Sequence, residues 1–203
     1  MVVGCDPGKA GAIVGVCTDH LDVLTLDMPC RGKADDVDTD AIEDTLLQWE
    51  ANNQEHISLV VIEEQHAFPG QGAVSGWTFA MNYGALRDRI RSMQRRRVEQ
   101  INAGVHINPI GLVEVGSQKW QKALGIVMPP APKRPKVVDK KHLTEAEAAA
   151  LKVHRGLLAQ RKKGVKAEVK SKVRDWYPQV DVGKGDGRSD ALALCRYGLL
   201  LGR

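Results

Sequence analysis

The sequence has few cysteines, no long apolar run and no basic segment ahead of an apolar one, and each absence excludes a class of protein. The four cysteines, Cys5, Cys17, Cys30 and Cys195, are widely spaced and form no C-x-x-C pair. They predict reduced, mostly buried thiols rather than a zinc site. No apolar stretch reaches the roughly 18 residues that a membrane span needs, and the chain opens on a strand-like run rather than a secretory signal. We therefore expect a cytoplasmic protein without a membrane partner.

Charge is distributed unevenly along the chain. Residues 1–67 carry 3 Lys/Arg against 14 Asp/Glu, a net charge of −11, whereas residues 68–203 carry 26 against 11, a net charge of +15. The basic residues would also suit a solvated surface. Their recurrence in clusters favours a polyanion, because each neutralised phosphate releases counterions. We predict nucleic acid rather than a membrane surface as the partner, since no lipidation motif accompanies the charge.

Length and residue pattern predict one α/β domain that spans residues 1–203. With 43% hydrophobic residues, the chain can form a single core. Apolar runs predict strands, whereas helical periods, caps and breakers predict helices. The predicted strands cover 2–6, 11–17, 22–28, 58–64 and 112–115; predicted helices start at 39 or 40 and cover 77–95, 118–124, 145–163, 166–177 and 190–201. Ser117 is the predicted cap of the helix 118–124, and Gly164 the predicted end of the helix that starts at 145. Three meandering strands, a helix and then a buried strand indicate a mixed sheet.

Residues 129–141 interrupt this pattern with four prolines and five Lys/Arg. They have no apolar period, so we predict a linker or a loop that becomes ordered on binding. Together with the helix that follows, they form a basic insertion at about 128–165.

Four carboxylates stand where a chain usually avoids charge, at the ends of apolar strands and at the start of an apolar helix. They are Asp6, Glu63, Asp186 and Asp190. Each alone has an ordinary explanation: a turn cap for Asp6, an exposed strand end for Glu63, and a favourable interaction with the helix dipole for the last two. Glu64 must face the other side of the sheet from Glu63, so only one of them can point with Asp6.

Together, the four carboxylates predict a metal site. Burying carboxylates side by side costs several kcal/mol unless a cation neutralises them. Oxygen ligands suit Mg²⁺, and two such ions can activate water and stabilise the leaving oxygen of a phosphodiester. We therefore predict an enzyme with two Mg²⁺ ions per active site, with Mn²⁺ as a possible substitute. No histidine base is needed, and His66 is expected in a loop near DNA rather than as a ligand.

Four segments carry a family resemblance: VVGCDPGKAGAIV, LVVIEEQHAFPGQGAVS, KAEVKSKV ahead of WYP, and DGRSDALAL. In this order they resemble the RuvC-type Holliday-junction resolvases, especially the phage branch. The resemblance covers most of the chain except roughly residues 128–165. It implies an RNase H-like fold with a mixed five-stranded sheet flanked by helices, and a homodimer formed through the helix at 77–91. It also implies Mg²⁺-dependent paired nicking of four-way DNA junctions, in the cytosol of a bacterium or phage-infected host.

The resemblance also implies roles for individual residues. Asp6, Glu63 and Asp190 match the catalytic metal ligands of the family. We take Asp186 as the fourth ligand, although bacterial members place the corresponding residue at the position of Gly187.

The resemblance and the basic clusters together predict DNA contacts. They are Phe68, Gln71, Lys122, Lys166 and Lys170. Lys166, in the K-A-x-V motif, is also a candidate catalytic group that stabilises the charge developing on the phosphate, with Lys122 as a second candidate. The ordinary alternative for both lysines is a plain phosphate contact or a solvent-exposed side chain, and for Lys122 this alternative is at least as strong. Phe68 or His66 is expected to wedge into the junction centre.

Three alternatives stay open. A nuclease of the same fold could remove branches or flaps from DNA. A non-catalytic DNA-binding module is disfavoured, because an idle acidic cluster would repel DNA. The Asp-x-Gly turn at 6–8 and the letters at 181–183 also occur in sugar kinases, but the chain is short for two kinase lobes.

Overall fold

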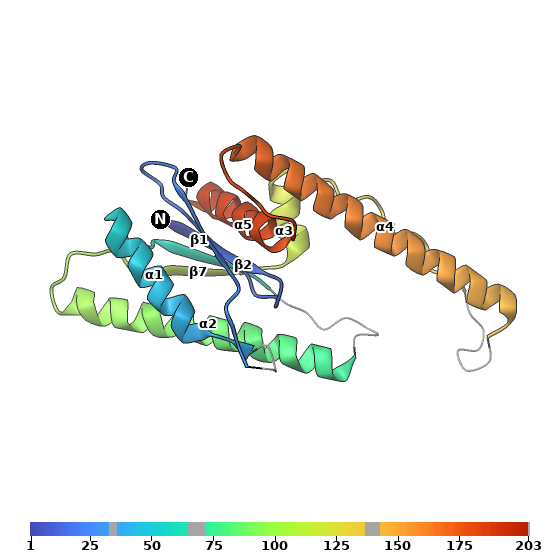
Figure 1. Cartoon of the computed structure of the whole chain (residues 1–203), viewed down its shortest axis with the longest axis horizontal. Helices are drawn as coiled ribbons and strands as arrows, with labels where there is room; N and C mark the ends of the chain where they lie inside the picture. Colours follow the sequence, from blue (N-terminus) through green and yellow to red (C-terminus); the bar gives the residue numbers. More distant parts are fainter. Residues whose placement is uncertain (33–35, 65–71, 137–142, 203) are drawn as a thin grey trace.

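The computed structural model describes residues 1–32, 36–64, 72–136 and 143–202, and shows a mixed sheet covered by helices on both faces (Figure 1). Its strands are β1 (Val2–Asp6), β2 (Ala12–Val16), β3 (Val23–Asp27), β6 (Leu59–Glu63) and β7 (Gly111–Val115). The strand order is β3-β2-β1-β6-β7, with β1, β2 and β3 antiparallel and β1, β6 and β7 parallel. The predicted α/β fold with a five-stranded mixed sheet is confirmed. Because β1 and β6 are parallel neighbours, their carboxyl ends lie side by side.

The helices divide between the two faces of the sheet. One face packs against α1 (Thr39–Asn53) and α2 (Ala73–Asn102), and the other against α3 (Ser117–Ala123), α5 (Gly187–Leu201) and part of α4 (Glu145–Trp176). A two-stranded ribbon of β4 (Cys30–Arg31) and β5 (Asp36–Val37), which the sequence did not predict, precedes α1. Strand residues alternate between two separate cores, as the period of two requires.

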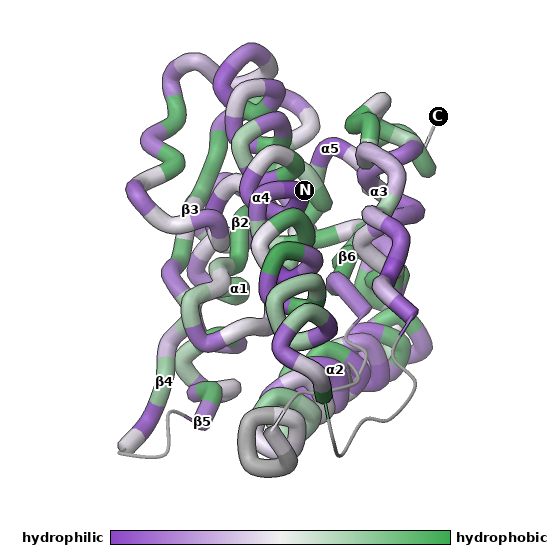
Figure 2. The backbone as a smooth tube through the Cα atoms, turned by 90° about the vertical axis from the view of Figure 1, so that its right-hand side faces the viewer, coloured by the Kyte–Doolittle hydropathy of each residue, from purple (hydrophilic) through white to green (hydrophobic). Residues whose placement is uncertain are grey.

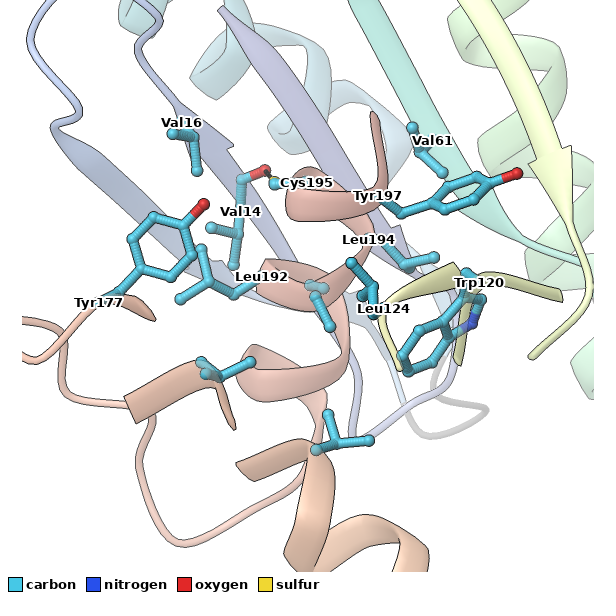
Figure 3. Close-up of a cluster of buried hydrophobic side chains, with 14 of the residues drawn as sticks. Val14, Val16, Val61, Trp120, Leu124, Tyr177, Leu192, Leu194, Cys195 and Tyr197 are labelled. Carbon is cyan, nitrogen blue, oxygen red and sulfur yellow. Dashed lines mark hydrogen bonds between the residues drawn. The ribbon is translucent and has the colours of Figure 1, made fainter. Parts of the chain in front are cut away.

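The helix α5 packs unusually close to the central strand β1. A Cβ atom on Gly4 would lie 2.0 Å from the carbonyl oxygen of Ala191 and 2.8 Å from the amide nitrogen of Cys195. Only a glycine fits here. Figure 3 shows the core on this face of the sheet, in which Leu192 and Leu194 of α5 lie among residues of β2 and α3 and beside Tyr177. This close contact fixes the position of α5 relative to the end of β1.

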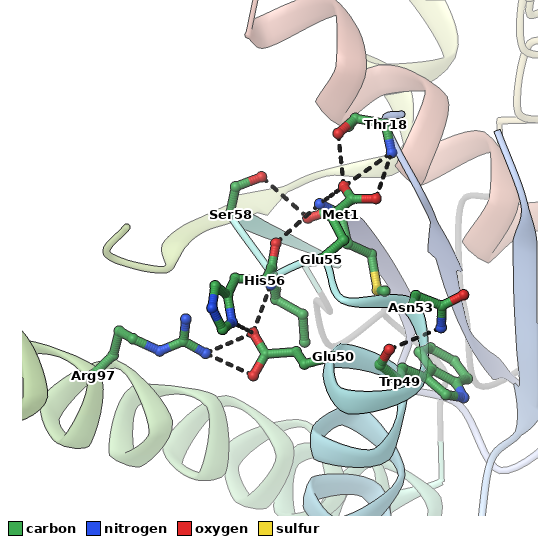
Figure 4. A network of polar contacts seen from close by, with 10 residues as sticks. Met1, Thr18, Trp49, Glu50, Asn53, Glu55, His56, Ser58 and Arg97 are labelled. Carbon is green, nitrogen blue, oxygen red and sulfur yellow. Dashed lines mark hydrogen bonds and ion pairs between the residues drawn. The ribbon is translucent and has the colours of Figure 1, made fainter. Parts of the chain in front are cut away.

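A buried ion pair joins α1 to α2 on the other face (Figure 4). Arg97 donates from Nη2 to both carboxylate oxygens of Glu50, at 2.6 and 2.7 Å. The same carboxylate accepts from the backbone N–H of Ile57 at 2.6 Å. Periodicity gave no hint of this pair, since both residues look like surface positions of charged helices.

Several predicted boundaries are wrong. Gly164 does not end a helix, because α4 runs without interruption through it. One glycine inside a helix costs about 1 kcal/mol. This cost is smaller than the stabilisation that α4 gains from burying Val165, Val169 and Val173, which follow the glycine. Ser117 is the first residue of α3 rather than its cap, which is Gly116. The helix α5 begins three residues earlier than predicted, and α2 is longer at both ends than the predicted 77–95.

The cysteines are mostly buried, as the sequence predicts. Cys5, Cys17 and Cys195 are buried, Cys30 is exposed, and all four are free thiols. Within the described ranges, none of the helices combines the length and the apolar character that crossing a membrane requires.

Candidate active site

Asp6 stands at the carboxyl end of β1, where a tight turn orients it. The Asp6 carboxylate accepts a hydrogen bond from the Gly8 amide at 3.3 Å, and the Gly11 amide donates to the Gly8 carbonyl at 2.8 Å. A Cβ on Gly11 would lie 2.1 Å from the carbonyl oxygen of Asp6, so this turn needs glycine. Burial raises the pKa of Asp6, although the Gly8 amide opposes the shift.

Glu63 stands at the end of the neighbouring strand β6. Cys5 of β1 pairs with Ile62 of β6, so the residues that follow each, Asp6 and Glu63, end adjacent parallel strands. Trp120 of α3 donates from its indole nitrogen to Glu63 Oε1 at 3.3 Å. Burial, and then the charge of Asp6, raise the pKa of Glu63 to about 7, while the Trp120 bond lowers it. The predicted choice of Glu63 over Glu64 agrees with this coupling to Asp6.

Asp186 and Asp190 occupy the start of α5, which a second close contact holds against the turn after β1. A Cβ on Gly187 would lie 2.4 Å from the carbonyl oxygen of Ala10. Asp186 is the cap residue, and its carbonyl accepts from the Asp190 amide at 2.9 Å. Burial, followed by the charges of Asp6 and then Glu63, raises the pKa of Asp190 to about 8.

Lys166 of α4 provides the positive charge at this site. Its Nζ lies 2.6 Å from Asp186 Oδ2, and its side chain is 52% exposed. The hydrogen bond to Asp186 raises the pKa of Lys166, and the charges of Asp190 and Asp6 add to the shift. The Lys166 charge in turn lowers the pKa of Asp6, Glu63 and Asp190. Five residues from four elements therefore form one electrostatic unit.

The chemistry of these side chains fits a hard divalent cation, although the ligands are not preassembled. Burial and mutual repulsion make the ionisation of these three carboxylates unfavourable even with the Lys166 ammonium beside them, and a bound Mg²⁺ would relieve this condition. Over residues 1–32, 36–64, 72–136 and 143–202, no group of three or more His, Cys, Asp or Glu side chains is placed to hold a metal ion as it stands. Binding would therefore require these carboxylates to turn toward a common centre.

The other predicted site residues lie in different surroundings. Phe68 and Gln71, and with them His66, lie outside the described residues. Lys122 is exposed on α3 and lines a groove of about 470 Å³. Lys170 donates from Nζ to the carbonyl oxygens of residues 184 and 185, at 3.0 and 3.1 Å. In the structure, Lys170 thus holds the loop that precedes α5.

Sequence reasoning missed two residues that shape the site. Trp120 orients Glu63, and Gly187 lets α5 approach the turn after β1. The buried tryptophan of a short helix that follows a parallel strand was the available signal for Trp120. Nothing local marks Gly187, since its role depends on a chain segment about 175 residues away in the sequence.

Comparisons with known proteins give similarities at the level of structure. No protein-family model and no curated protein matches this chain. A structure of Thermus thermophilus RuvC is similar, at 15% identity and a TM-score of 0.45, with 99% of this chain and 96% of that chain covered. T. thermophilus RuvC in complex with a Holliday junction substrate is similar over the same shares, at 15% identity and a TM-score of 0.46. The yeast mitochondrial Holliday junction resolvase Ydc2 is similar at 12% identity and a TM-score of 0.36, over 99% of this chain and 80% of that chain.

Proposed function

We propose that this protein is a Mg²⁺-dependent endonuclease that resolves four-way DNA junctions by paired nicking. The observation that carries the proposal is the meeting of Asp6, Glu63 and Asp190, from three separate elements, at one edge of the sheet beside Lys166. Such a costly arrangement of like charges is typical of catalytic sites rather than of stable surfaces. The four sequence motifs that resemble junction resolvases support the choice of substrate.

In this proposal each residue has a distinct part. Asp6, Glu63 and Asp190 would hold the metal, with Asp186 as the fourth ligand. Bound divalent ions supply an activated water and neutralise charge on the leaving oxygen of the phosphodiester. The Lys166 ammonium, 2.6 Å from Asp186, stabilises the negative charge that develops on the phosphate.

Neighbouring groups keep the carboxylates in position. The Gly8 amide holds Asp6, and the Trp120 indole holds Glu63, at 3.3 Å in each case. The carbonyl contacts of Lys170 hold the loop ahead of α5, and thereby the aspartates at its start. We propose Lys122 as a phosphate contact, because it is exposed on the same short helix as Trp120.

We further propose a homodimer formed through α2. This helix exposes Trp77 (70%) and Met81 (52%), which lie one turn apart on one side. A second copy related by a two-fold axis would bury this apolar surface and match the near two-fold symmetry of a junction. Wild-type protein should sediment as a dimer, and Trp77→Ala should shift the equilibrium toward monomer. A monomeric wild type at micromolar concentration would contradict this part.

The test of function is cleavage of a synthetic four-way junction in Mg²⁺. Asp6→Asn should abolish cleavage while junction binding in EDTA is retained. Undiminished cleavage by this variant would end the proposal. Rates on four-way, three-way and flap substrates should rank the four-way junction first. A preference for flaps would point instead to a debranching nuclease of the same fold, and binding by wild type without cleavage of any substrate would point to a non-catalytic module.

A further inference from the structure

The helix α4 extends well beyond the body of the protein. Every residue of α4 is described, and its buried ones are Val165, Val169 and Val173, all in the C-terminal half. Residues 145–164 therefore form a projecting arm about 30 Å long. Figure 1 shows this half of α4 reaching past the sheet, on the side where β7 leads into α3.

The proline-rich segment braces one side of this arm. Arg161 donates from Nε to the carbonyl oxygen of Pro129 at 2.6 Å, and His154 Nε2 lies 3.1 Å from the carbonyl oxygen of Pro132. Proline lacks a backbone N–H, so the segment offers mainly acceptors, and the basic side chains of α4 meet them. The described part of the predicted linker is therefore packed along α4.

A different side of α4 carries a row of positive charge, here named the α4 basic stripe. It consists of Lys152, Arg155, Lys163, Lys166 and Lys170. Ala159 lies between Arg155 and Lys163. When it is counted, each position is three or four residues from the next, so all of them share one side of the helix. The first four are exposed, and residues 148–167 include no Asp or Glu. In Figure 2, α4 shows both hydrophilic and hydrophobic turns along its length.

The stripe ends at the candidate active site. Lys166 belongs to both, since its ammonium contacts Asp186 at 2.6 Å. From Lys166 to Lys152 the stripe covers 14 residues, or about 21 Å of helix. At 3.4 Å per nucleotide, that length matches about 6 base pairs of duplex.

We propose that the α4 basic stripe binds the phosphate backbone of the duplex arm that adjoins the cleaved phosphate. This inference rests on the proposed nuclease function and adds a substrate requirement to it: a duplex flank of about 6 base pairs. A phosphate in the active site would lie beside Lys166, so its strand could continue past Lys163 toward Arg155 and Lys152, with the uncharged Ala159 between Lys163 and Arg155. Positions 148–167 hold no Asp or Glu, so no acidic residue in this part of the helix offsets the charges of Lys152, Arg155 and Lys163.

The first test measures junction binding in EDTA as a function of salt, with Asp6→Asn as the background so that cleavage plays no part. Arg155→Ala and Lys163→Ala should each reduce the slope of log Kd against log salt by about 0.9. Raising the salt from 50 to 200 mM increases the Kd of both proteins. The increase should be about 12 times smaller for the double variant than for its Asp6→Asn parent. Arg95→Ala is the matched control, because Arg95 is an exposed arginine on α2, on the other face of the sheet. Equal effects of Arg155→Ala and Arg95→Ala would overturn the inference.

The second test varies the length of the duplex arms, each closed by a hairpin loop. The parent should bind arms of about 15 base pairs more tightly than arms of about 4 base pairs, which are shorter than the stripe. The Arg155→Ala/Lys163→Ala variant should bind both with similar affinity. A length dependence that survives the double substitution would show that other residues hold the flank. If the Asp6→Asn parent binds a four-way junction no more tightly than linear duplex DNA, the result would instead count against the proposed function.

Discussion

Replacing Asp190 with asparagine should stabilise the metal-free protein at alkaline pH while abolishing cleavage. The pKa of Asp190 is raised from 3.8 to about 8 by burial and by the charges of Asp6 and Glu63. A group whose pKa is higher in the folded than in the unfolded protein contributes its full stability at pH values below its unfolded-state pKa. This contribution is lost as the pH rises toward its folded-state pKa. In EDTA, the wild type should therefore lose stability between about pH 4 and pH 8.

The expected size follows from the shift. One pKa unit corresponds to about 1.4 kcal/mol, so the shift of Asp190 amounts to as much as about 5 kcal/mol at pH 8. Solvent screening at this partly exposed position reduces the figure to about 2 kcal/mol. Asparagine has the shape of the protonated acid and does not ionise. The advantage of Asp190→Asn over wild type should thus be small at pH 5 and reach about 2 kcal/mol at pH 8.

Chemical denaturation in EDTA at pH 5 to 9 measures this difference. Asp44→Asn is the control, since Asp44 is an exposed aspartate of α1 on the other face of the sheet. Mg²⁺ should stabilise the wild type at pH 8 and stabilise Asp190→Asn much less. An Asp190→Asn variant that is no more stable than wild type at pH 8 in EDTA would show that the carboxylates are not under electrostatic strain.

Three other substitutions test the packing of the fold, its buried ion pair and the hydrogen bond to Glu63. Gly4→Ala places a methyl group 2.0 Å from the Ala191 carbonyl, so it should cost about 3 kcal/mol in the free energy of unfolding, measured by urea denaturation. Arg97→Ala leaves the Glu50 carboxylate buried without its arginine partner and should cost about 3–5 kcal/mol in the free energy of unfolding; an apolar replacement of both residues should recover most of this loss, and no recovery would contradict an electrostatic cause. Trp120→Phe removes the hydrogen bond that lowers the pKa of the site glutamate, so the pH midpoint of Mg²⁺-induced stabilisation should move upward; an unchanged or lower midpoint would show that the bond does not tune the site.

The sequence predicted the sheet well because its strands have clear local signals. The runs at 2–5 and 59–62 are continuous and apolar, and each ends in a carboxylate. Parallel pairing of the two strands then brings those carboxylates to one edge, as the structure confirms for Asp6 and Glu63. Local patterns thus carried most of the fold and the core of the candidate site.

Long-range contacts account for what the sequence did not predict. The continuity of α4 through Gly164 depends on valines that pack against the body of the protein. The Glu50–Arg97 pair joins two helices whose charged residues look like surface residues. The approach of α5 to β1 depends on Gly4, a glycine that looks ordinary in the sequence. In each case the deciding partner is remote in the chain.

Crystals soaked in Mn²⁺ and measured for anomalous scattering would show directly whether the carboxylates at the sheet edge form a divalent-metal site. We expect manganese between Asp6, Glu63 and Asp190, with their side chains turned toward it. The same map shows whether Asp186 joins the metal or keeps its contact with Lys166. Occupied manganese sites elsewhere on the protein, with none among Asp6, Glu63 and Asp190, would show that these carboxylates do not form the metal site.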